Sequence, residues 1–422
     1  MNAPARHAHP IAGVSAGSRD GFPVLLAPVA DQAAVEKALI EKARAIAVKI
    51  AGPNAADVDA RARFPREAFA AMRTERLLGA MIPRAFGGEE ASIATIAEIC
   101  SVLAQACAST AMIYAMHQIK VSSLTVHCLD DTWHRGFMSR IADEQLLLGS
   151  ATTEGSGVGG DMRSSVCGIV RDGDVFTLEK EGTLISYGAE ADAILITARR
   201  TPEAPASDQV MAVMTREQYT LERTGVWDAM GMRGTCSDSF TFAGSAPVEQ
   251  IIATPFAEIA GQSMLPYAHL LWGSVWYGIA SDAVARAESF VRSEARKRPG
   301  TTPPSAVRLA ELLALLQRMK SLVVAGIERY ERAKQDPDEL SSIGFVVAMN
   351  SVKLVASQSV GEIVNHAFLI CGIQGYRNDS PLSLSRHMRD ALSAPVMINN
   401  DRILGNTSNL LAVYKHDASL TR

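Results

Sequence analysis

The spacing of apolar residues changes twice along this chain of 422 residues, and these two changes constrain its fold most. From Asp31 to about Glu144, apolar residues recur at intervals of three and four, as in a helix with one buried face. From Gln145 to about Phe256, short runs rich in Val, Ile, Thr and Phe alternate with turn residues, which is typical of strands. Helical spacing returns at about Met264 and continues almost to the C-terminus. The pattern therefore predicts helices, then strands, then helices.

This order predicts an α+β fold in three parts, and the length of the chain suits two or three domains. We expect residues 31–144 to form an N-terminal helical domain, residues 145–256 a central antiparallel β domain, and residues 257–422 a C-terminal four-helix bundle. No helical period links the strand runs, so we expect antiparallel pairing without helical crossovers. Residues 1–30 are rich in Pro, Gly, Ser and Ala without periodicity, which predicts a flexible N-terminal tail.

Local signals predict where several elements begin or turn. Pro65 is expected to open a helix over residues 66–76, and Thr132 to cap the helix that follows it. The segment Arg171 to Asp174 predicts a tight hairpin turn, because Gly173 can take a positive φ. The predicted strands are Leu146 to Ala151, Val175 to Leu178, Ala193 to Ala198, Gln209 to Thr215, Tyr219 to Arg223 and Ser239 to Phe242.

Charge and cysteine spacing argue against several functions. A net charge of -4 at pH 7 and a pI near 6.2 give no electrostatic reason to expect nucleic acid or an anionic membrane surface as a partner. No stretch reaches the roughly eighteen uninterrupted apolar residues that predict a membrane span. The six cysteines lie far apart, with no C-x-x-C pair and no Cys/His cluster at metal-ligand spacing. We therefore predict no disulfide, no metal site and a reducing, cytoplasmic location.

Two segments more than two hundred residues apart carry the most informative motifs. The first runs from Thr152-Thr153-Glu154 into the glycine-rich stretch Gly155 to Asp161. The second is Cys371-Gly372-Ile373-Gln374-Gly375-Tyr376, followed by Arg389-Asp390. One segment lies among predicted strands and the other between predicted helices. If they serve one ligand, the fold must bring the β domain and the C-terminal helices together around it.

These segments and several others resemble signatures of the acyl-CoA dehydrogenase family of flavoproteins. The resemblance spans roughly residues 31 to 415, and the matching segments occur in the family's order. They are Phe64-Pro65-Arg66-Glu67, Ile82 to Gly88, Thr153-Glu154 through Gly160-Asp161 for T-E-P-x-x-G-S-D, Gly231-Met232-Arg233-Gly234-Thr235 for G-x-R-G-[ST], and Arg386-His387-Met388-Arg389-Asp390 for R-x-x-R-D.

The resemblance implies a homotetramer, a dimer of dimers, with FAD between the β domain and the C-terminal helices. Part of each ADP moiety would be held by the neighbouring subunit. Strand-end hydroxyls such as that of Thr153 suit the edge of the flavin ring, and small residues let the backbone approach a pyrophosphate. The expected cofactor-binding residues are Thr152, Thr153, Ile185, Ser186, Gly372 and Gly375, and the expected substrate-binding residues are Gly160 and Asp161.

The family reaction removes a proton from Cα and a hydride from Cβ of a thioester, and it needs a basic group near Cα, usually a glutamate. Counting from Arg389-Asp390, the usual glutamate position falls on Ile398, and the alternative position falls near Ala268. No carboxylate lies between Met264 and Ser281. The chain thus resembles an atypical member that lacks the usual catalytic glutamate. The candidates for a replacement base are His117, His387 and Asp401.

Other positions depart from the family pattern or have ordinary structural explanations. The family's Trp-Ile-Thr, which borders the flavin, corresponds to Leu184-Ile185-Ser186, so a hydroxyl is kept and a ring is lost. Glu154 is expected to be a solvated loop carboxylate that caps a turn. Arg389-Asp390 could be an ion pair that fixes a loop, and Asp401 an N-cap of the last helix.

These features predict an FAD-dependent oxidoreductase that catalyses α,β-dehydrogenation of an acyl thioester, either acyl-CoA or acyl-carrier protein, with a non-standard base. Electrons would pass to an electron-transfer flavoprotein or another acceptor. One alternative is a flavin-dependent monooxygenase on the same fold, which needs no carboxylate at Cα. The other is a non-catalytic flavin-binding homologue, since function resides in sites and not in folds.

Overall fold

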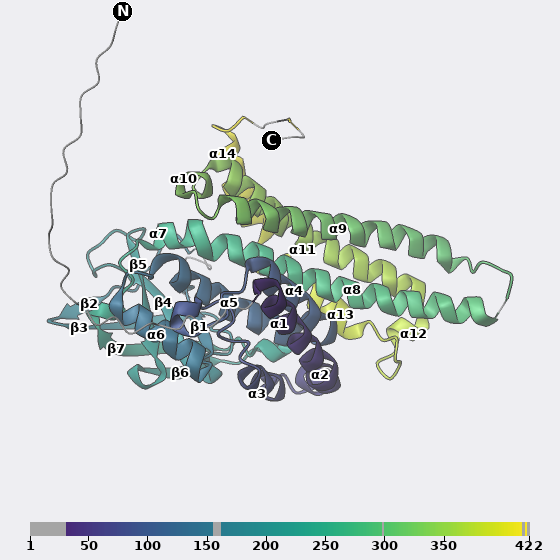
Figure 1. Cartoon of the computed structure of the whole chain (residues 1–422), viewed down its shortest axis with the longest axis horizontal. Coiled ribbons are helices and arrows are strands. Elements are labelled where there is room, and N and C mark those ends of the chain that lie inside the picture. The colour runs from purple at the N-terminus through teal and green to yellow at the C-terminus, as the bar shows by residue number, and fades with distance from the viewer. Residues whose placement is uncertain (1–30, 155–161, 298, 416–417, 420–422) are drawn as a thin grey trace, which may run out of the picture.

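A computed structural model describes residues 31–154, 162–297, 299–415 and 418–419. The predicted tail of residues 1–30 and the predicted substrate-binding residues Gly160 and Asp161 lie outside the described residues. Within the described chain, helices give way to strands between Glu144 and Leu148, and strands give way to helices between Pro247 and Phe256. The α+β fold class predicted from the sequence is confirmed (Figure 1).

Six α-helices form the described N-terminal part, and the fourth and fifth of them are mostly buried. The helices are α1 (Gln32–Ile46), α2 (Gly52–Ala60), α3 (Arg66–Thr74), α4 (Ile93–Ala106), α5 (Ala108–His127) and α6 (Thr132–Glu144). The helix predicted after Pro65 is present as α3. The predicted cap of α6 was wrong: the carboxylate of Asp131, and not Thr132, accepts the backbone N–H of His134 at 2.9 Å. A carboxylate satisfies a free N–H of the first turn, so Thr132 begins the helix itself.

The described residues of the central part form two sheets. The strands are β1 (Leu148–Ala151), β2 (Val170–Asp172), β3 (Val175–Gly182), β4 (Ala193–Arg199), β5 (Gln209–Thr215), β6 (Tyr219–Gly225) and β7 (Ser239–Pro247). One sheet has the order β1-β4-β5 and the other β2-β3-β7-β6. The hairpin predicted at Arg171 to Asp174 is confirmed as the β2–β3 turn, where Gly173 has a φ of 59°.

The prediction of purely antiparallel pairing was wrong at one place, because β1 and β4 are parallel. A parallel pair needs a connection that returns to the same end of the sheet, and a helix usually supplies it. Here the chain between β1 and β4 contributes β2 and β3 to the second sheet instead. The absence of a helical period between the strands therefore did not exclude a parallel pair. All the other strand pairs are antiparallel in the described residues.

Three long helices dominate the C-terminal part and lie lengthwise against one another (Figure 1). The helices are α7 (Phe256–Ile259), α8 (Leu265–Lys297), α9 (Ser305–Ala333), α10 (Pro337–Leu340), α11 (Ile343–Cys371), α12 (Ile373–Tyr376), α13 (Ser385–Ala391) and α14 (Asn400–Leu411). A π-helical turn, Ala260–Met264, joins α7 to α8. Helix α14 is a shorter fourth helix that packs on α11.

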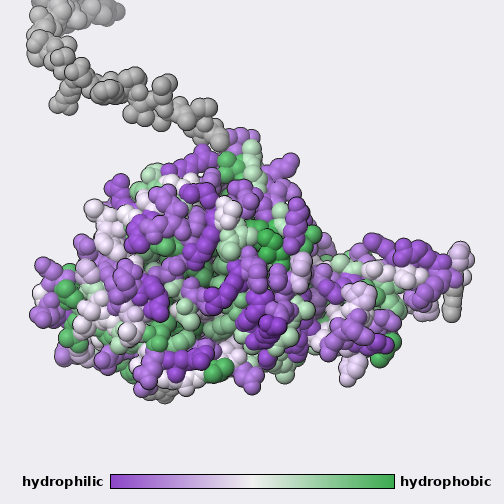
Figure 2. All heavy atoms as spheres, turned by 90° about the horizontal axis from the view of Figure 1, so that it is seen from below, coloured by the Kyte–Doolittle hydropathy of each residue, from purple (hydrophilic) through white to green (hydrophobic). Residues whose placement is uncertain are grey.

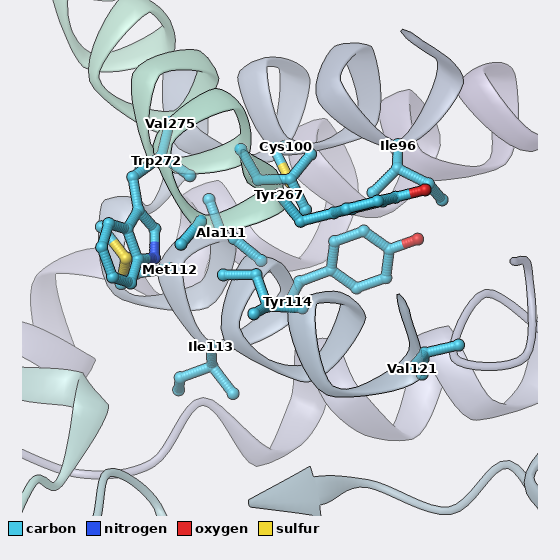
Figure 3. Close-up of a cluster of buried hydrophobic side chains, with 14 of the residues drawn as sticks. Ile96, Cys100, Ala111, Met112, Ile113, Tyr114, Val121, Tyr267, Trp272 and Val275 are labelled. Carbon is cyan, nitrogen blue, oxygen red and sulfur yellow. The ribbon is translucent and has the colours of Figure 1, made fainter. Parts of the chain in front are cut away.

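Helix α8 joins the two helical parts, because it packs on α11 and α9 on one side and on α4 and α5 on the other. Figure 3 shows part of this core, with Tyr267, Trp272 and Val275 of α8 drawn together with Cys100 of α4 and Tyr114 of α5. The crossing with α4 is close: a Cβ at Gly278 would meet the carbonyl oxygen of Ser101 at 2.3 Å. The N-terminal helices and the bundle thus share one continuous hydrophobic core.

Helix α11 is long and apolar enough to cross a membrane by length and composition alone. Half of its most apolar window is nevertheless buried inside the protein, where α11 packs between α8 and α9. A core helix of a bundle has this same pattern. Figure 2 shows one face of the molecule, on which polar side chains predominate and apolar ones are scattered.

Candidate active site

A pocket lies where the three parts of the chain meet. Its wall is formed by α5, the end of β1, the segment before the first 3-10 turn of the β part, the start of α8 and the loop before α14. Its lining is mostly apolar. The lining residues are Met116, Ile119, Lys120, Ser150, Thr152, Thr153, Met162, Leu184, Ser186, Tyr187, Met264, Leu265, Ala268, Trp272, Met397 and Ile398. None of these described lining residues is an aspartate or a glutamate.

Three hydroxyl-bearing residues predicted to bind the cofactor are brought together here: Thr152, Thr153 and Ser186. Thr152 and Thr153 directly follow β1, so the strand end places them at the pocket. Leu184, which stands at the position of the family's tryptophan, also lines the wall and is 47% exposed. A hydrophobic side chain this exposed beside a pocket offers an apolar contact surface for a bound molecule.

A chain of hydroxyl groups fixes the orientation of Ser186. Thr235 Oγ1 donates to the carbonyl oxygen of Met232 at 2.8 Å, so it must accept from Ser237 Oγ, also at 2.8 Å. Ser237 has then used its proton, and Ser186 Oγ must donate to it at 2.8 Å. The oxygen of Ser186 therefore offers lone pairs to the pocket. This chain links the pocket to the turn formed by Gly231 to Thr235.

The two positions at which the family carries its base both lie on the pocket wall. Ala268 reaches it from the first turn of α8, and Ile398 from the loop before α14. Ile398 has a φ of 47°, an unusual conformation for a β-branched side chain. Conformations of this kind persist only where the surrounding structure holds them.

Lys353 of α11 holds the backbone at Ile398 in this conformation. Its Nζ donates to the carbonyl oxygens of Ala394 at 3.3 Å and Ile398 at 2.7 Å, and to Asn400 Oδ1 at 2.6 Å. Burial lowers the pKa of Lys353 to about 8. The three acceptors compensate a buried ammonium and tie the loop 394–400 to the bundle. Lys353 therefore fixes the part of the wall that Ile398 forms.

His117, a predicted catalytic residue, does not line the pocket and has both ring nitrogens occupied. Its Nδ1 accepts the backbone N–H of Leu148 at 3.0 Å, so Nε2 carries the proton and donates to the carbonyl oxygen of Leu78 at 2.8 Å. Burial lowers the pKa of His117 to about 4, which keeps the ring neutral. These bonds hold β1 against the N-terminal helices, and we assign His117 this structural role.

The other two predicted catalytic residues also lie away from the pocket lining. His387 Nε2 is 2.7 Å from Asp282 Oδ2 on α8. Burial raises the pKa of Asp282, but the bonds from His387 and Arg286 outweigh it and lower the pKa to about 2. Asp401 is exposed in the first turn of α14. Its predicted role as the N-cap was wrong, because the side chain of Asn399 accepts the N–H of Asp401 at 2.8 Å.

Three predicted cofactor-binding residues lie outside the pocket lining. Ile185 is fully buried in the core of the β part beside Ser186. Gly372 and Gly375 lie at the end of α11 and in α12, at the end of the bundle farthest from the β part (Figure 1). Gly372 has a φ of 54° and a ψ of -132°, which only glycine adopts without strain. No side chain would obstruct a Cβ at this position, so the backbone conformation alone requires glycine.

Glu154 was predicted to be a solvated loop carboxylate, and this was wrong. Its side chain is 4% exposed and lies 3.0 Å from Nζ of Lys180, whose side chain is 1% exposed. It also accepts from the Ser165 hydroxyl and from the N–H of Val166 at 2.7 Å. Burial raises the pKa of Glu154, but Lys180 and these hydrogen bonds more than reverse the effect. The pair anchors the chain directly after Thr153.

The motifs Gly231 to Thr235 and Arg389-Asp390 contact each other. The N–H of Met232 donates to Asp390 Oδ1 at 2.6 Å, and a Cβ at Gly231 would meet the Arg389 carbonyl oxygen at 2.2 Å. Burial raises the pKa of Asp390 to about 6. Arg389 pairs with Asp59 of α2 and donates to the carbonyl oxygen of Met230 at 3.0 Å. Arg389 and Asp390 do fix loops, although through separate partners and not as a mutual ion pair.

Comparison with known protein families gives one consistent result. A model of the acyl-CoA dehydrogenase N-terminal domain matches residues 34–145, and a model of the acyl-CoA dehydrogenase C-terminal domain matches residues 260–398. These ranges coincide with the two helical parts that enclose the pocket. The second range ends on Ile398.

Individual relatives are more varied. The chain is 24% identical over 374 residues to cyclohex-1-ene-1-carbonyl-CoA dehydrogenase of Geobacter metallireducens, covering 87% of this chain and 95% of the relative. It is 27% identical over 344 residues to the amino sugar nitrososynthase DnmZ of Streptomyces peucetius, covering 78% and 81%. Among solved structures, FMN-bound TdsC from Paenibacillus sp. A11-2 superimposes with a TM-score of 0.76 at 21% identity, covering 91% and 98%.

Proposed function

Because the chain belongs to the acyl-CoA dehydrogenase family, we propose that it is a flavin-dependent oxidoreductase that removes two hydrogens from Cα and Cβ of an acyl thioester. The thioester is carried by CoA or by an acyl-carrier protein. One observation carries the proposal: the hydroxyls of Thr153 and Ser186 and both family base positions, Ala268 and Ile398, converge on one apolar pocket. A pocket of this kind, with few polar groups in fixed positions, suits a ring-shaped cofactor and an acyl chain.

The residues present fit a flavin, which when bound supplies the hydride-accepting chemistry. Thr153 and Ser186 would hold the polar edge of the ring system, and Trp272 with Met116 would contact its apolar surface. TdsC, which shares the fold and is FMN-bound, supports a flavin cofactor. We take the flavin to be FAD, because Gly372 and Gly375 are available to a second subunit.

A homotetramer would make use of these distant glycines. They lie too far along the bundle to meet the pocket of their own chain, so they would contact the FAD of a neighbouring subunit. Large hydrophobic side chains on the C-terminal helices support a subunit interface there, because they are exposed in the single chain. They include Val307, Leu313, Val324, Val355, Leu369, Ile373, Tyr376, Leu404 and Leu411. An electron-transfer flavoprotein is the expected electron acceptor.

Anaerobic mixing of FAD-loaded protein with a panel of acyl-CoA thioesters tests the reaction. Loss of flavin absorbance together with formation of the α,β-unsaturated thioester, detected by mass spectrometry, is the expected result. The panel should range from short and branched to cyclic and long acyl chains. If no thioester changes the flavin spectrum although the protein binds FAD, the proposed reaction is wrong.

The missing carboxylate favours a second candidate, monooxygenation. No described lining residue is an aspartate or glutamate, and insertion of an oxygen atom requires no base at Cα. DnmZ, a nitrososynthase, shows that a relative with another activity matches most of this chain. Oxygen consumption with externally reduced flavin and an apolar substrate, without bleaching by acyl-CoA under anaerobic conditions, would favour this second candidate.

A further inference from the structure

Lys120 brings a basic nitrogen to the otherwise apolar helical wall of the pocket. It lies on α5, is 5% exposed, and its Nζ is 3.1 Å from Sδ of Met264. Met264 and Ala268 are four residues apart in a continuous helical stretch, so they lie on one face, one turn apart. Lys120 therefore contacts the residue one helical turn before Ala268, a position where some family members carry their base, and Lys120 and Ala268 line the same pocket.

Lys120 differs from the other buried lysines of the described chain in its partners. Lys180 faces the carboxylate of Glu154 at 3.0 Å, and Lys353 donates to three oxygen atoms. For Lys120, a thioether sulfur is the partner in the described structure. A sulfur atom is a weak acceptor and compensates little of the cost of a buried ammonium. Lys180 and Lys353 thus have oxygen partners that hold them in structural roles, whereas Lys120 faces the pocket.

A buried amine without an anionic partner favours its neutral form. Burial lowers the pKa of Lys120 to about 7. Near neutral pH a substantial fraction of the Lys120 side chains is therefore neutral, and the neutral amine carries a free lone pair. A general base works best when its pKa is near the working pH. The side chain has the properties of a proton acceptor.

Few other groups near Lys120 titrate. From the β part Tyr187 lines the pocket, but its hydroxyl donates to the carbonyl oxygen of Leu148, and burial raises its pKa. From α8, Tyr267 is buried and its pKa is likewise raised by burial. On α5 itself, His127 lies two turns away, and its Nε2 is 3.1 Å from Ser263 Oγ. None of these groups carries a charge near pH 7 that would offset a change on Lys120.

We propose that Lys120 is the base that takes the Cα proton of the acyl thioester. This inference rests on the proposed dehydrogenation. The Cα–H bond breaks and its proton bonds to Nζ, the electron pair of that bond forms the Cα=Cβ double bond, and a hydride leaves Cβ for the bound flavin, which is the oxidant. Lys120 ends as an ammonium, and it returns the proton to solvent after the unsaturated product leaves. The lysine replaces the carboxylate absent at Ala268 and Ile398.

Exchange of α protons tests the base separately from the oxidation. Phenylacetyl-CoA has α protons but no hydrogen on its β carbon, so it can exchange protons with deuterated solvent but cannot donate a hydride. FAD-loaded wild type should incorporate deuterium, detected by NMR, at a rate that increases with pH through about 7. Lys120→Met and Lys120→Arg should each slow this exchange at least about 100-fold. Both should also slow bleaching of the flavin by acyl-CoA.

The controls separate a catalytic role from a structural one. Lys37→Met, at an exposed position of α1, should leave exchange unchanged. Binding of FAD by the Lys120 variants should stay within a few-fold of wild type. If a variant does not fold, the pH profile of exchange in wild type decides, and a flat profile between pH 6 and 8 overturns the assignment. Bleaching and exchange at wild-type rates in Lys120→Met would overturn Lys120 alone, whereas no bleaching by any thioester in wild type would overturn the proposed reaction.

Discussion

Breaking the buried pair between Glu154 and Lys180 should be among the most damaging single changes to the β part. Their side chains are 4% and 1% exposed. Lys180→Met would leave a carboxylate buried with only neutral donors, and Glu154→Gln would leave a buried ammonium with only neutral acceptors, among them the Thr197 carbonyl oxygen at 2.5 Å. Removing one partner of such a pair costs about 3–5 kcal/mol. Because Glu154 directly follows Thr153, the same change should displace that hydroxyl and weaken FAD binding.

A double-mutant cycle measured by urea unfolding with circular dichroism tests this reasoning. Lys180→Met with Glu154→Gln removes both charges together, so it should cost far less than the sum of the single changes, with a coupling above about 3 kcal/mol. Glu181→Gln, on the exposed face of the same strand, is the matched control and should change stability by less than about 0.5 kcal/mol. An unfolding midpoint of Glu154→Gln equal to that of wild type would refute the pairing.

The remaining predictions address the pocket and the helix core. Ser186→Ala should weaken FAD binding about fivefold in a fluorescence titration, because it loses one hydrogen bond of about 1 kcal/mol; unchanged affinity would place the ring elsewhere. Ile398→Glu in the Lys120→Met background should raise the rate of flavin bleaching by acyl-CoA at least about tenfold in stopped-flow absorbance, since it returns a carboxylate to the family position. An unchanged rate would show that a side chain at position 398 does not reach the reacting carbon. Between pH 7 and 10.5 the folded state binds fewer protons on Lys120 than the unfolded state. The unfolding free energy of wild type relative to Lys120→Met should therefore rise with pH, by up to about 5 kcal/mol. A difference that stays constant with pH would contradict the lowered pKa of Lys120. Gly278→Ala should destabilise by at least about 1–3 kcal/mol through its clash with α4, whereas Gly361→Ala in open space on α11 should stabilise by about 0.5–1 kcal/mol; thermal unfolding of both variants checks the difference.

The order of helices and strands could be predicted because it rests on local periodicity. The burial of Val, Ile and Leu at regular intervals needs no knowledge of distant partners. The parallel pairing of β1 with β4 could not be predicted in this way, because the chain between them belongs to a second sheet. Pairing depends on which strands meet in space, and the sequence of either strand alone does not contain that information.

The site could be predicted in part for the same reason. Thr153, Ser186 and Ile398 were located by motif or by counting, and they share one pocket. Lys120 was missed, because a lysine in an apolar helix has no motif and its importance comes from a missing partner. Glu154 was misassigned, because its partner Lys180 lies on β3, far from it along the chain. Long-range pairing of charges decides burial, and no local pattern reports it.

A structure of the protein reconstituted with FAD would show whether this pocket holds the flavin. Ring density should lie in the pocket between the β part and the C-terminal helices, with Ser186 Oγ within hydrogen-bond distance of the ring and Trp272 and Ile398 against it. The ADP portion should extend toward Gly372 and Gly375 of a neighbouring subunit. Flavin density outside this pocket, or a protein that takes up no FAD at saturating concentration, would contradict it.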